Sequence, residues 1–415
     1  MKELTEMGKR ACEAKYVLGA LSSEKKNAVL YRAAMLLRSG KEALLKANAE
    51  DIARARENGM KEAMIDRLTL NEKRIDGIAE GLEQVALLPD PIGEVMDHFT
   101  RPNGLDIEKV RVPLGVIGII FESRPNVCAD AFALTFKSGN AVILKGGSDA
   151  LHTNLAIETL LRQALREEGV TEDAVQVIDS TDRAVTTAFM QMKEYVDVLI
   201  PRGGAGLIRS VVEHSTIPVI ETGTGNCHVY VDESADLEMA VRIVVNAKTQ
   251  RISVCNACES LVVHSAVKDR FLPMLKEALQ PSGVEMRGDE RVREVLPDIV
   301  PATEEDYGRE YLDYILSLKT VDSTEEAIAH INRYNTHHSE TIVTGTPEHA
   351  ESFLNGVDAA CVYVNASTRF TDGFEFGFGA EIGISTQKFH ARGPMGLKEL
   401  TSYKYKIRGN GQIRS

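Results

Sequence analysis

The feature that most constrains the fold is an alternation of short β-rich runs with segments of helical pattern, which begins after residue 111. Apolar and β-branched residues dominate each run, and the segment Leu155–Glu168 between two of them has helical periodicity. The runs are Val112–Phe121, Ala141–Leu144, Ala174–Ile178 and Val196–Ile200. Strands that alternate with helices form a parallel sheet with crossover connections, so an α/β fold is expected.

A second block of the same kind begins near Thr222. Helical pattern is present at Asp236–Lys248 and Thr324–Arg333. The strand-like runs are His228–Val231, Ser260–His264, Tyr314–Val321, Glu340–Val343 and Ala360–Val364. Residues 1 to about 90 instead predict a layer of helices. At 415 residues, the chain is expected to form two to three domains.

A turn signal, Arg101-Pro102-Asn103-Gly104, precedes the first α/β block. The alternating run Leu105–Val112 follows this turn and suits an exposed hairpin arm. Such a hairpin either reaches another subunit or is an ordinary surface feature, and the residues alone leave both interpretations open.

Charge and cysteine usage narrow the range of partners and locations. The formal net charge of −13 repels nucleic acid and anionic membrane surfaces. The longest apolar stretch, Val112–Phe121, is about half as long as a bilayer-spanning helix, and the charges within Met1–Ala20 are unlike a signal peptide. The six cysteines have no secretory context, and the histidines lack metal-ligand spacing. We expect a cytoplasmic protein with reduced thiols and no metal, membrane segment or nucleic acid partner.

The segment Arg251–Glu259 places Cys255 between a helical pattern and a strand-like run. Backbone N–H groups are often unpaired at such a junction and could hold the oxyanion that forms when a thiolate attacks an acyl carbon. A single cysteine is otherwise more often a small buried apolar residue. Cys255 and Cys258 also form a C-x-x-C pair, but the second pair of a zinc site is missing and the position does not suit a thioredoxin-like motif.

Two glycine-rich turns could bring backbone N–H groups against a phosphate. One ends the run Ala141–Ser148, and the other ends the run Val198–Gly206. Neither matches G-x-G-x-x-G or a P-loop, so ordinary turns are the alternative. A third segment, Asn365–Gly383, combines glycine with aromatic and hydroxyl side chains, which suits a binding loop or else a long surface connection.

Several strings in this sequence resemble the γ-glutamyl phosphate reductase family. They include Val-Pro-Leu-Gly-Val-Ile-Gly from Val112, Phe-Glu-Ser-Arg-Pro-Asn-Val from Phe121, and Pro-Val-Ile-Glu-Thr-Gly-Thr-Gly-Asn-Cys-His-Val-Tyr-Val-Asp from Pro218. A further match is Glu-Phe-Gly-Phe-Gly-Ala-Glu-Ile-Gly-Ile-Ser-Thr-Gln-Lys from Glu375. With Ile200–Arg209, Asn246–Ala257 and Val362–Arg414, the likeness runs nearly end to end.

That family belongs to the aldehyde dehydrogenase superfamily, so the resemblance implies two Rossmann-like α/β domains and a small β oligomerisation element. By this resemblance, the NADP-binding domain comprises residues 1–98 and 113–221, and the catalytic domain with Cys255 comprises 222–365. The oligomerisation arm comprises 99–112 and 400–415, and residues 366–399 form a loop region that returns to the cofactor domain.

The resemblance also implies a mechanism. Cys255 is the nucleophile that attacks L-glutamyl 5-phosphate, and NADPH reduces the resulting thioester to L-glutamate 5-semialdehyde in the second step of proline biosynthesis. Glu221 lies 34 residues before Cys255, where hydrolytic aldehyde dehydrogenases carry a water-activating Glu. Activating water would waste the thioester, so Glu221 either handles the thiol proton or orders its loop.

By the same resemblance, Lys145 contacts the adenosine ribose and Glu310 holds the nicotinamide ribose. Ser148 is neutral where an acidic residue would repel a 2′-phosphate, so NADP(H) is the expected cofactor. Gly203 and Gly204 belong to the second phosphate-binding turn. The candidate cationic and polar contacts of the substrate are Arg124, Asn126 and Arg369.

The expected partners are further copies of the chain in a homo-oligomer and glutamate 5-kinase, the preceding enzyme. Two other functions fit parts of the sequence. One is a hydrolytic aldehyde dehydrogenase that uses Glu221 as a base, and the other is a thiol redox protein built on Cys255 and Cys258.

Overall fold

The computed structural model describes residues 2–122 and 124–414, which divide into two compact units. Unit 1 contains the chain up to Thr222, the segment Gly377–Gly383 and the chain from Met395 onward. Unit 2 contains Gly223–Phe376 and Ile384–Pro394. The C-terminal part of the chain therefore contributes to both units.

Unit 1 is built on a parallel sheet with the strand order β5-β4-β3-β6. The strands are β3 (Val116–Phe121), β4 (Ala141–Lys145), β5 (Val175–Val177) and β6 (Val198–Arg202). All residues of β3 and β4 are buried, as expected for a parallel sheet that is covered on both faces. Because β3 pairs in parallel with both β4 and β6, the carboxyl ends of these strands meet at one edge of the sheet.

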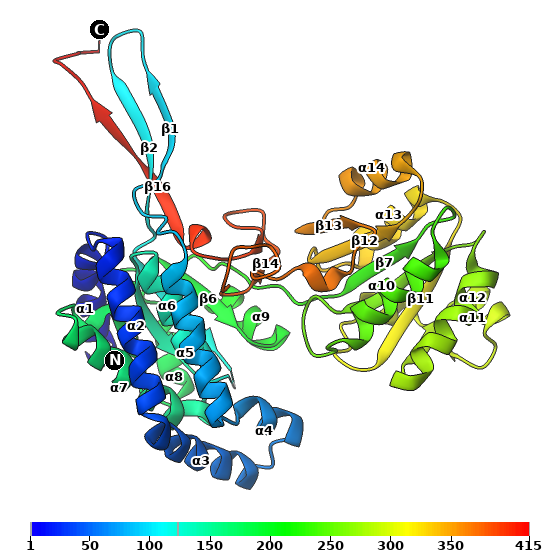
Figure 1. Cartoon of the computed structure of the whole chain (residues 1–415), viewed down its shortest axis with the longest axis horizontal. Helices are drawn as coiled ribbons and strands as arrows, with labels where there is room; N and C mark the ends of the chain where they lie inside the picture. The colour runs from blue at the N-terminus through cyan, green and yellow to red at the C-terminus, as the bar shows by residue number, and fades with distance from the viewer. Residues whose placement is uncertain (1, 123, 415) are drawn as a thin grey trace. The chain divides into compact units, whose positions relative to one another are not determined.

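Helices cover the unit 1 sheet, and the predicted helical layer of the first 90 residues is confirmed. These helices are α1 (Lys2–Leu18), α2 (Ser23–Ser39), α3 (Lys41–Glu57), α4 (Glu62–Leu68), α5 (Glu72–Leu87), α6 (Asn126–Lys137), α7 (Leu151–Glu167), α8 (Arg183–Phe189) and α9 (Ala205–His214). Ser22 and Asn71 start α2 and α5, where each side chain accepts a hydrogen bond from a first-turn N–H group. The two helices pack side by side (Figure 1).

The predicted hairpin arm is also confirmed as part of unit 1. It pairs β1 (Val95–Thr100) with β2 (Asp106–Pro113) in antiparallel register, and β16 (Thr401–Arg408) joins the other edge of β2. Every residue of β1 is exposed, and seven of the eight residues of β16 are exposed. Figure 1 shows these three strands extending away from the helices of unit 1.

The run Val112–Phe121, predicted as one strand, is two strands in two different sheets. β2 ends at Pro113, which has no N–H group to donate, and β3 begins at Val116. Between them Gly115 has a φ of +129°, and a Cβ atom there would lie 2.1 Å from Asp197 Oδ2. The bend therefore depends on a glycine that a pattern of hydrophobicity does not distinguish.

Unit 2 is a second parallel sheet, with the strand order β10-β9-β11-β8-β7-β12-β13. Its strands are β7 (Cys227–Val231), β8 (Cys258–His264), β9 (Glu285–Gly288), β10 (Val300–Pro301), β11 (Ile315–Val321), β12 (Ser339–Val343) and β13 (Cys361–Val364). The strands predicted at the five β-rich runs are confirmed within one or two residues. A small hairpin, β14 (Ile384–Ser385) and β15 (Gly393–Pro394), lies in the returning C-terminal segments.

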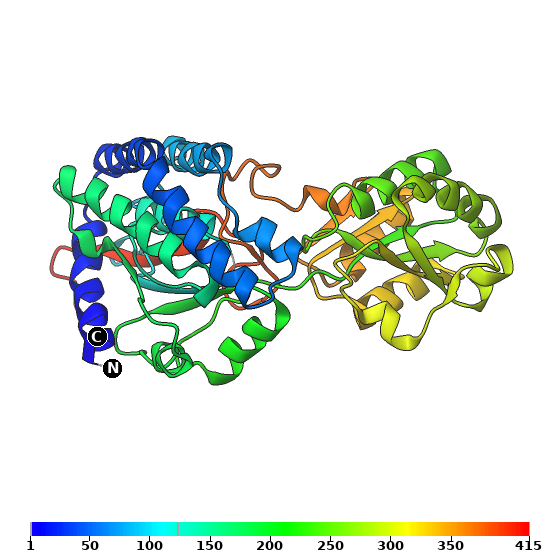
Figure 2. The same cartoon turned by 90° about the horizontal axis from the view of Figure 1, so that it is seen from below.

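Helices lie on both faces of the unit 2 sheet (Figure 2). They are α10 (Leu237–Thr249), α11 (Lys268–Leu279), α12 (Glu290–Val295), α13 (Thr324–Tyr334) and α14 (Pro347–Gly356). Alternate strand residues point to opposite faces: Val229 and Val263 pack with α10 and α11, whereas Tyr230 and Val262 pack with α13 and α14. In the described part of the chain, no helix combines the length and hydrophobicity that crossing a bilayer requires.

Candidate active site

Cys255 lies in a loop of unit 2 between the end of α10 at Thr249 and the start of β8 at Cys258. The predicted helix-to-strand junction is therefore present. A backbone hydrogen bond of 3.1 Å from Ala257 N to Val254 O closes a tight turn around the half-buried Cys255. We call residues 250–257 the nucleophile loop.

Gly225, which precedes β7, fixes the backbone of this loop. A Cβ atom at Gly225 would lie 1.4 Å from the carbonyl oxygen of Cys255, so no other residue fits without moving the loop. The Cys227 thiol donates a hydrogen bond of 3.2 Å to the same oxygen. Burial, with a smaller contribution from Glu340, raises the pKa of Cys227 well above its usual value and keeps it a protonated donor.

Asn256 ties the nucleophile loop to the C-terminal glycine-rich segment. Its side-chain Nδ2 donates to Thr371 O at 2.9 Å and to Arg369 O at 3.3 Å. In return, Thr368 Oγ1 donates to Asn256 O at 2.8 Å. These contacts hold Arg369 next to the loop, where its Nε donates to Gln250 Oε1 at 2.9 Å.

The Arg369 guanidinium is close enough to Cys255 for their charges to interact. Burial lowers the pKa of Arg369, the neighbouring Arg251 lowers it further, and Cys255 acts in the opposite direction. A cation beside a thiol favours its thiolate, which is the nucleophilic form. Arg369 can thus assist the nucleophile as well as bind an anionic group.

Glu310 reaches the same place from the loop before β11. Its Oε1 accepts a hydrogen bond of 2.7 Å from Gly225 N, and burial raises the pKa of this carboxyl. Gly225 therefore contacts both Cys255 and Glu310. Within unit 2, the structure brings together the three predicted residues Cys255, Arg369 and Glu310.

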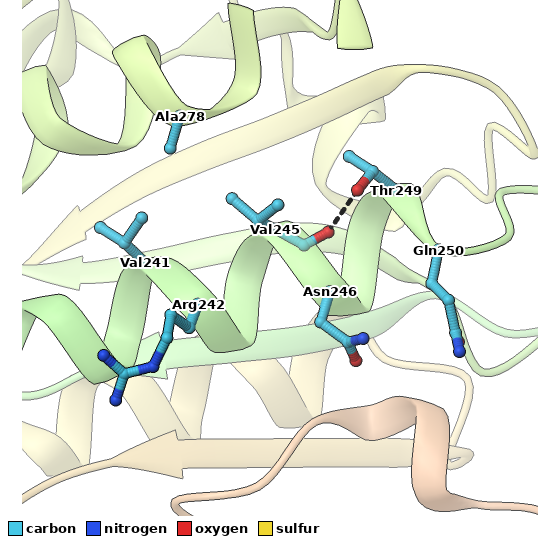
Figure 3. A pocket seen from close by; sticks show the side chains of 7 residues that line it. All are labelled: Val241, Arg242, Val245, Asn246, Thr249, Gln250 and Ala278. Carbon is cyan, nitrogen blue, oxygen red and sulfur yellow. Dashed lines mark hydrogen bonds between the residues drawn. The ribbon is translucent and has the colours of Figure 1, made fainter. Parts of the chain in front are cut away.

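The outer face of α10 borders a shallow hollow that ends at Gln250, the partner of Arg369 (Figure 3). Its lining residues are Val241, Arg242, Val245, Asn246, Thr249, Gln250 and Ala278. Thr249 Oγ1 donates to Val245 O at 2.7 Å, which satisfies the hydroxyl within the helix. The hollow thus borders the nucleophile loop without including Cys255.

Cys258 is a poor second thiol for a redox pair. It is the first residue of β8, is fully buried, and donates to Ser260 O at 3.3 Å. Burial raises its pKa to about 12, so its thiolate is scarce at neutral pH. Cys255 and Cys258 are both thiols in the structure.

In unit 1, Lys145 ends β4 and Ser148 begins a short 3₁₀ turn, Ser148–Ala150. The Lys145 ammonium donates to Gly146 O at 2.7 Å, and burial lowers its pKa, with Asp149 opposing. The buried amide of Asn154 lies under this turn, since a Cβ at Gly146 would be 2.3 Å from its Nδ2. Among the described residues, that amide has no hydrogen-bond partner, so polar groups remain available here.

Gly203 and Gly204 lie at the N-terminus of α9, directly after β6. Gly204 N donates to Glu122 Oε2 at 2.9 Å, and a Cβ atom at Gly203 would lie 2.4 Å from that oxygen. An anionic oxygen thus occupies the position where a helix N-terminus binds phosphate. Both glycine-rich turns lie at the carboxyl edge of the unit 1 sheet, on either side of β3, so the residues fit a dinucleotide.

The remaining predicted residues also belong to unit 1. Arg124 is exposed just before α6, and Asn126 is the first residue of that helix. The Asn126 side chain donates to Asp130 Oδ2 at 2.8 Å on its own helix. Glu221 is half-buried and follows the bridge between Val219 and Leu199 of β6. These three residues are therefore placed by β6 and α6 and not by the nucleophile loop.

Sequence analysis missed three residues of these sites: Gly225, Asn256 and Glu122. Each stands inside a string that carried the family resemblance, and Asn256 directly follows Cys255. Their hydrogen bonds and close approaches, however, join segments far apart in the chain. No group of three or more potential ligands in the described ranges is arranged to hold a metal ion.

The chain is similar to known proteins along its full length. The aldehyde dehydrogenase family model matches residues 2–295. A γ-glutamyl phosphate reductase of Agathobacter rectalis is 60% identical over 417 residues, covering 100% of both chains. The crystal structure of the γ-glutamyl phosphate reductase of Thermotoga maritima is 51% identical, with a TM-score of 0.98 over 100% of both chains.

A more distant structure shares the fold alone. An acetylating aldehyde dehydrogenase of Geobacillus thermoglucosidasius is 17% identical, with a TM-score of 0.69 over 100% of this chain and 98% of that chain. The predicted aldehyde dehydrogenase-like α/β fold is confirmed by the full-length match at a TM-score of 0.98. The chain belongs to the aldehyde dehydrogenase family and, within it, to the γ-glutamyl phosphate reductases.

Proposed function

We propose that Cys255 is the nucleophile in the NADPH-dependent reduction of L-glutamyl 5-phosphate to L-glutamate 5-semialdehyde and phosphate, the second step of proline biosynthesis. The observation that carries this proposal is the arrangement around the nucleophile loop. Gly225 and Cys227 fix the backbone carbonyl of Cys255. Cys255 is half-buried and interacts electrostatically with the Arg369 guanidinium. The substrate follows from the name that its full-length relatives share.

The chemistry assigned to Cys255 has two parts. Its thiolate attacks the acyl carbon, the C–O bond to phosphate breaks with its electron pair, and a thioester forms. After reduction of the acyl group, the C–S bond breaks, the thiolate is restored and the aldehyde is released. Phosphate is a good leaving group, so the protein mainly positions the acyl group and stabilises the oxyanion.

NADPH supplies the hydride when it is bound, and we assign five residues to its binding. Lys145, Ser148, Gly203 and Gly204 would supply polar and backbone groups, and Glu310 would supply a carboxylate. The N-terminus of α9 would hold a phosphate of the cofactor, and Gly204 N, which donates to Glu122 Oε2 in this structure, would be its donor. Ser148 carries no charge to repel a 2′-phosphate, which favours NADPH over NADH.

The substrate is anionic at its phosphate and carboxylate groups, so Arg124, Asn126 and Arg369 are assigned to it. Glu221 is assigned to the thiol proton or to the order of its own loop, because a reductase gains nothing from activating water. A base role for Glu221 would instead give a hydrolytic aldehyde dehydrogenase, which is the alternative function.

We assign the assembly of a homo-oligomer to the arm of residues 99–112 and 400–415. Acyl phosphates hydrolyse readily in water, so a kinase that phosphorylates the γ-carboxyl of glutamate must supply the substrate, and glutamate 5-kinase is the proposed associate. Six thiols and a reaction that consumes NADPH favour the cytoplasm.

The test runs the reaction in reverse, as NADP-dependent oxidation of glutamate 5-semialdehyde with and without inorganic phosphate. We expect phosphate-dependent NADPH formation that is lost in Cys255→Ser and retained in Cys258→Ser, the matched control with a buried thiol. Turnover without phosphate would assign the chain to the hydrolytic class. Activity that survives in Cys255→Ser would exclude Cys255 as the nucleophile.

A further inference from the structure

A buried ion pair joins the two elements that flank the nucleophile loop, α10 and β8. Lys248 is in the last turn of α10, and Glu259 is the second residue of β8. Lys248 Nζ lies 2.6 Å from Glu259 Oε2, and both side chains are 0% exposed. The pair therefore connects the segment that enters the nucleophile loop with the segment that leaves it.

The other oxygen of the same carboxylate holds a different loop. Glu259 Oε1 accepts a hydrogen bond of 3.1 Å from Leu312 N. Leu312 has a φ of +53°, a left-handed backbone conformation that is unfavourable for a branched side chain and needs support. Glu310, whose own carboxylate accepts from Gly225 N, lies two residues earlier in this loop. One carboxylate thus contacts the helix end that leads into the nucleophile loop and the loop that contains Glu310.

Stability alone does not explain a charged pair at this position. Removing two ions from water costs free energy, and replacing a buried pair with apolar residues of similar size is often neutral or stabilising. Burial raises the pKa of Glu259 to about 7, and Lys248 opposes this rise. Beyond packing, the pair fixes the orientation of the Glu259 carboxylate, because each of its two oxygens has a donor.

We propose that Glu259 is a positioning residue, which orients the nucleophile loop through Lys248 and the Glu310 loop through Leu312. This inference rests on the proposed roles of Cys255 and Glu310. It assigns separate effects to the two oxygens: contact with Lys248 affects turnover, and contact with Leu312 affects cofactor binding.

The test uses two double variants that leave no unpaired charge. Lys248→Met with Glu259→Gln removes the ion pair but keeps a side-chain oxygen for Leu312 N, whereas Lys248→Met with Glu259→Leu removes both contacts. We expect kcat to fall about ten-fold in both variants. The NADPH dissociation constant, measured by fluorescence without substrate, should rise about ten-fold only in the Leu variant.

The control is the pair Lys26→Met with Asp90→Asn in unit 1, where Lys26 Nζ lies 2.8 Å from Asp90 Oδ2 and Lys26 is 0% exposed. This variant should lower the unfolding temperature while kcat and NADPH affinity stay unchanged. Equal NADPH affinities in the Gln and Leu variants, or an unchanged kcat in the Gln variant, would overturn the proposal. Should the Leu variant not fold, the kcat of the Gln variant decides alone. A failure of the role proposed for Cys255 would be detected independently of these variants, by the phosphate-dependent activity assay on the wild type and Cys255→Ser.

Discussion

Gly225 is the residue with the strictest steric demand in unit 2. The nearest atoms to an added Cβ are backbone atoms of Cys255, which cannot rotate away as the end of a side chain could. We therefore expect Gly225→Ala to displace the nucleophile and lower kcat/KM by about a hundred-fold, the cost typical of a misplacement near 1 Å. Steady-state kinetics and the rate of Cys255 alkylation would measure the effect.

Gly77→Ala is the matched control for this substitution. Gly77 lies within α5, and apart from its chain neighbours and the backbone of its own helix, no described atom lies within 4 Å of an added Cβ atom. Alanine in a helix interior is favoured over glycine by about 0.5–1 kcal/mol, so this variant should be slightly more stable and fully active. Full activity in Gly225→Ala would show that the nucleophile loop can move away from the added methyl group without loss of function.

For single residues, the sequence predicted which residues belong to the site better than it predicted which residues contact one another. Cys255 and Glu310 were assigned by their strings, and the structure places them around one glycine. The pairing of Lys248 with Glu259 was not predicted, because opposite charges eleven residues apart meet only when a helix end and a strand start are adjacent. Tertiary packing decides such a contact, and a single sequence contains no direct signal for it.

At the scale of elements, long periodic segments were predicted and short irregular ones were not. α13 and β8 follow their patterns closely, because one apolar face or a continuous apolar run marks them. β9 reads Glu-Met-Arg-Gly and β10 reads Val-Pro, so neither shows a run of apolar or β-branched residues. Both become strands because β11 offers β9 a hydrogen-bonding edge, and β9 then offers one to β10.

The arm offers a prediction about assembly. β1 and β16 form its two free edges, and apolar side chains such as Phe99, Tyr403 and Ile407 are exposed on it. Exposed edges and apolar patches favour association with another chain. If the arm assembles the proposed homo-oligomer, deleting residues 401–415 should give monomers while both parallel sheets remain folded, as measured by light scattering and circular dichroism.

Deleting only residues 409–415 is the corresponding control, because β16 ends at Arg408 and keeps its full register with β2. The proposed oligomer should survive this shorter deletion. An unchanged molecular mass after removal of the whole strand would assign assembly to a different surface and leave the arm without that role.

At the scale of the whole molecule, the two units differ in how their acidic residues are held. In unit 2, burial opposes ionisation of Asp232, but hydrogen bonds from Ser234, His349 and Thr344 hold its pKa well below the usual range. In unit 1, glutamates with lowered pKa such as Glu83 and Glu172 form partly exposed ion pairs, with Arg38 and Arg166 respectively. Exposed pairs contribute little free energy, so the acid-sensitive stability is concentrated in unit 2.

A pH titration of hydrogen exchange tests this difference. A carboxylate with a lowered folded pKa contributes stability above its unfolded pKa near 4, and this contribution is lost as pH falls through the folded value. Groups with raised pKa, such as Asp130 in unit 1 and Glu259 in unit 2, are protonated in both states below about pH 4 and add nothing further there. Between about pH 4 and 2.5, protection in β7 and β12 should therefore fall before protection in β3 and β4.

Asp232→Asn tests whether one side chain causes the difference in acid sensitivity between the two units. The amide cannot accept all the hydrogen bonds that the carboxylate accepts, so unit 2 should lose about 3 kcal/mol at neutral pH. Because the titrating group is gone, the remaining stability of unit 2 should vary less with pH in the acidic range. The two units should then lose protection over more similar pH ranges. The Asp358 carboxylate is 37% exposed and paired with Lys388 and Arg392. Asp358→Asn should therefore leave unchanged the order in which the two units lose protection as pH falls. If β3 and β4 lost protection first in the wild type, the acid-sensitive stability would lie in unit 1, against the distribution of buried carboxylates.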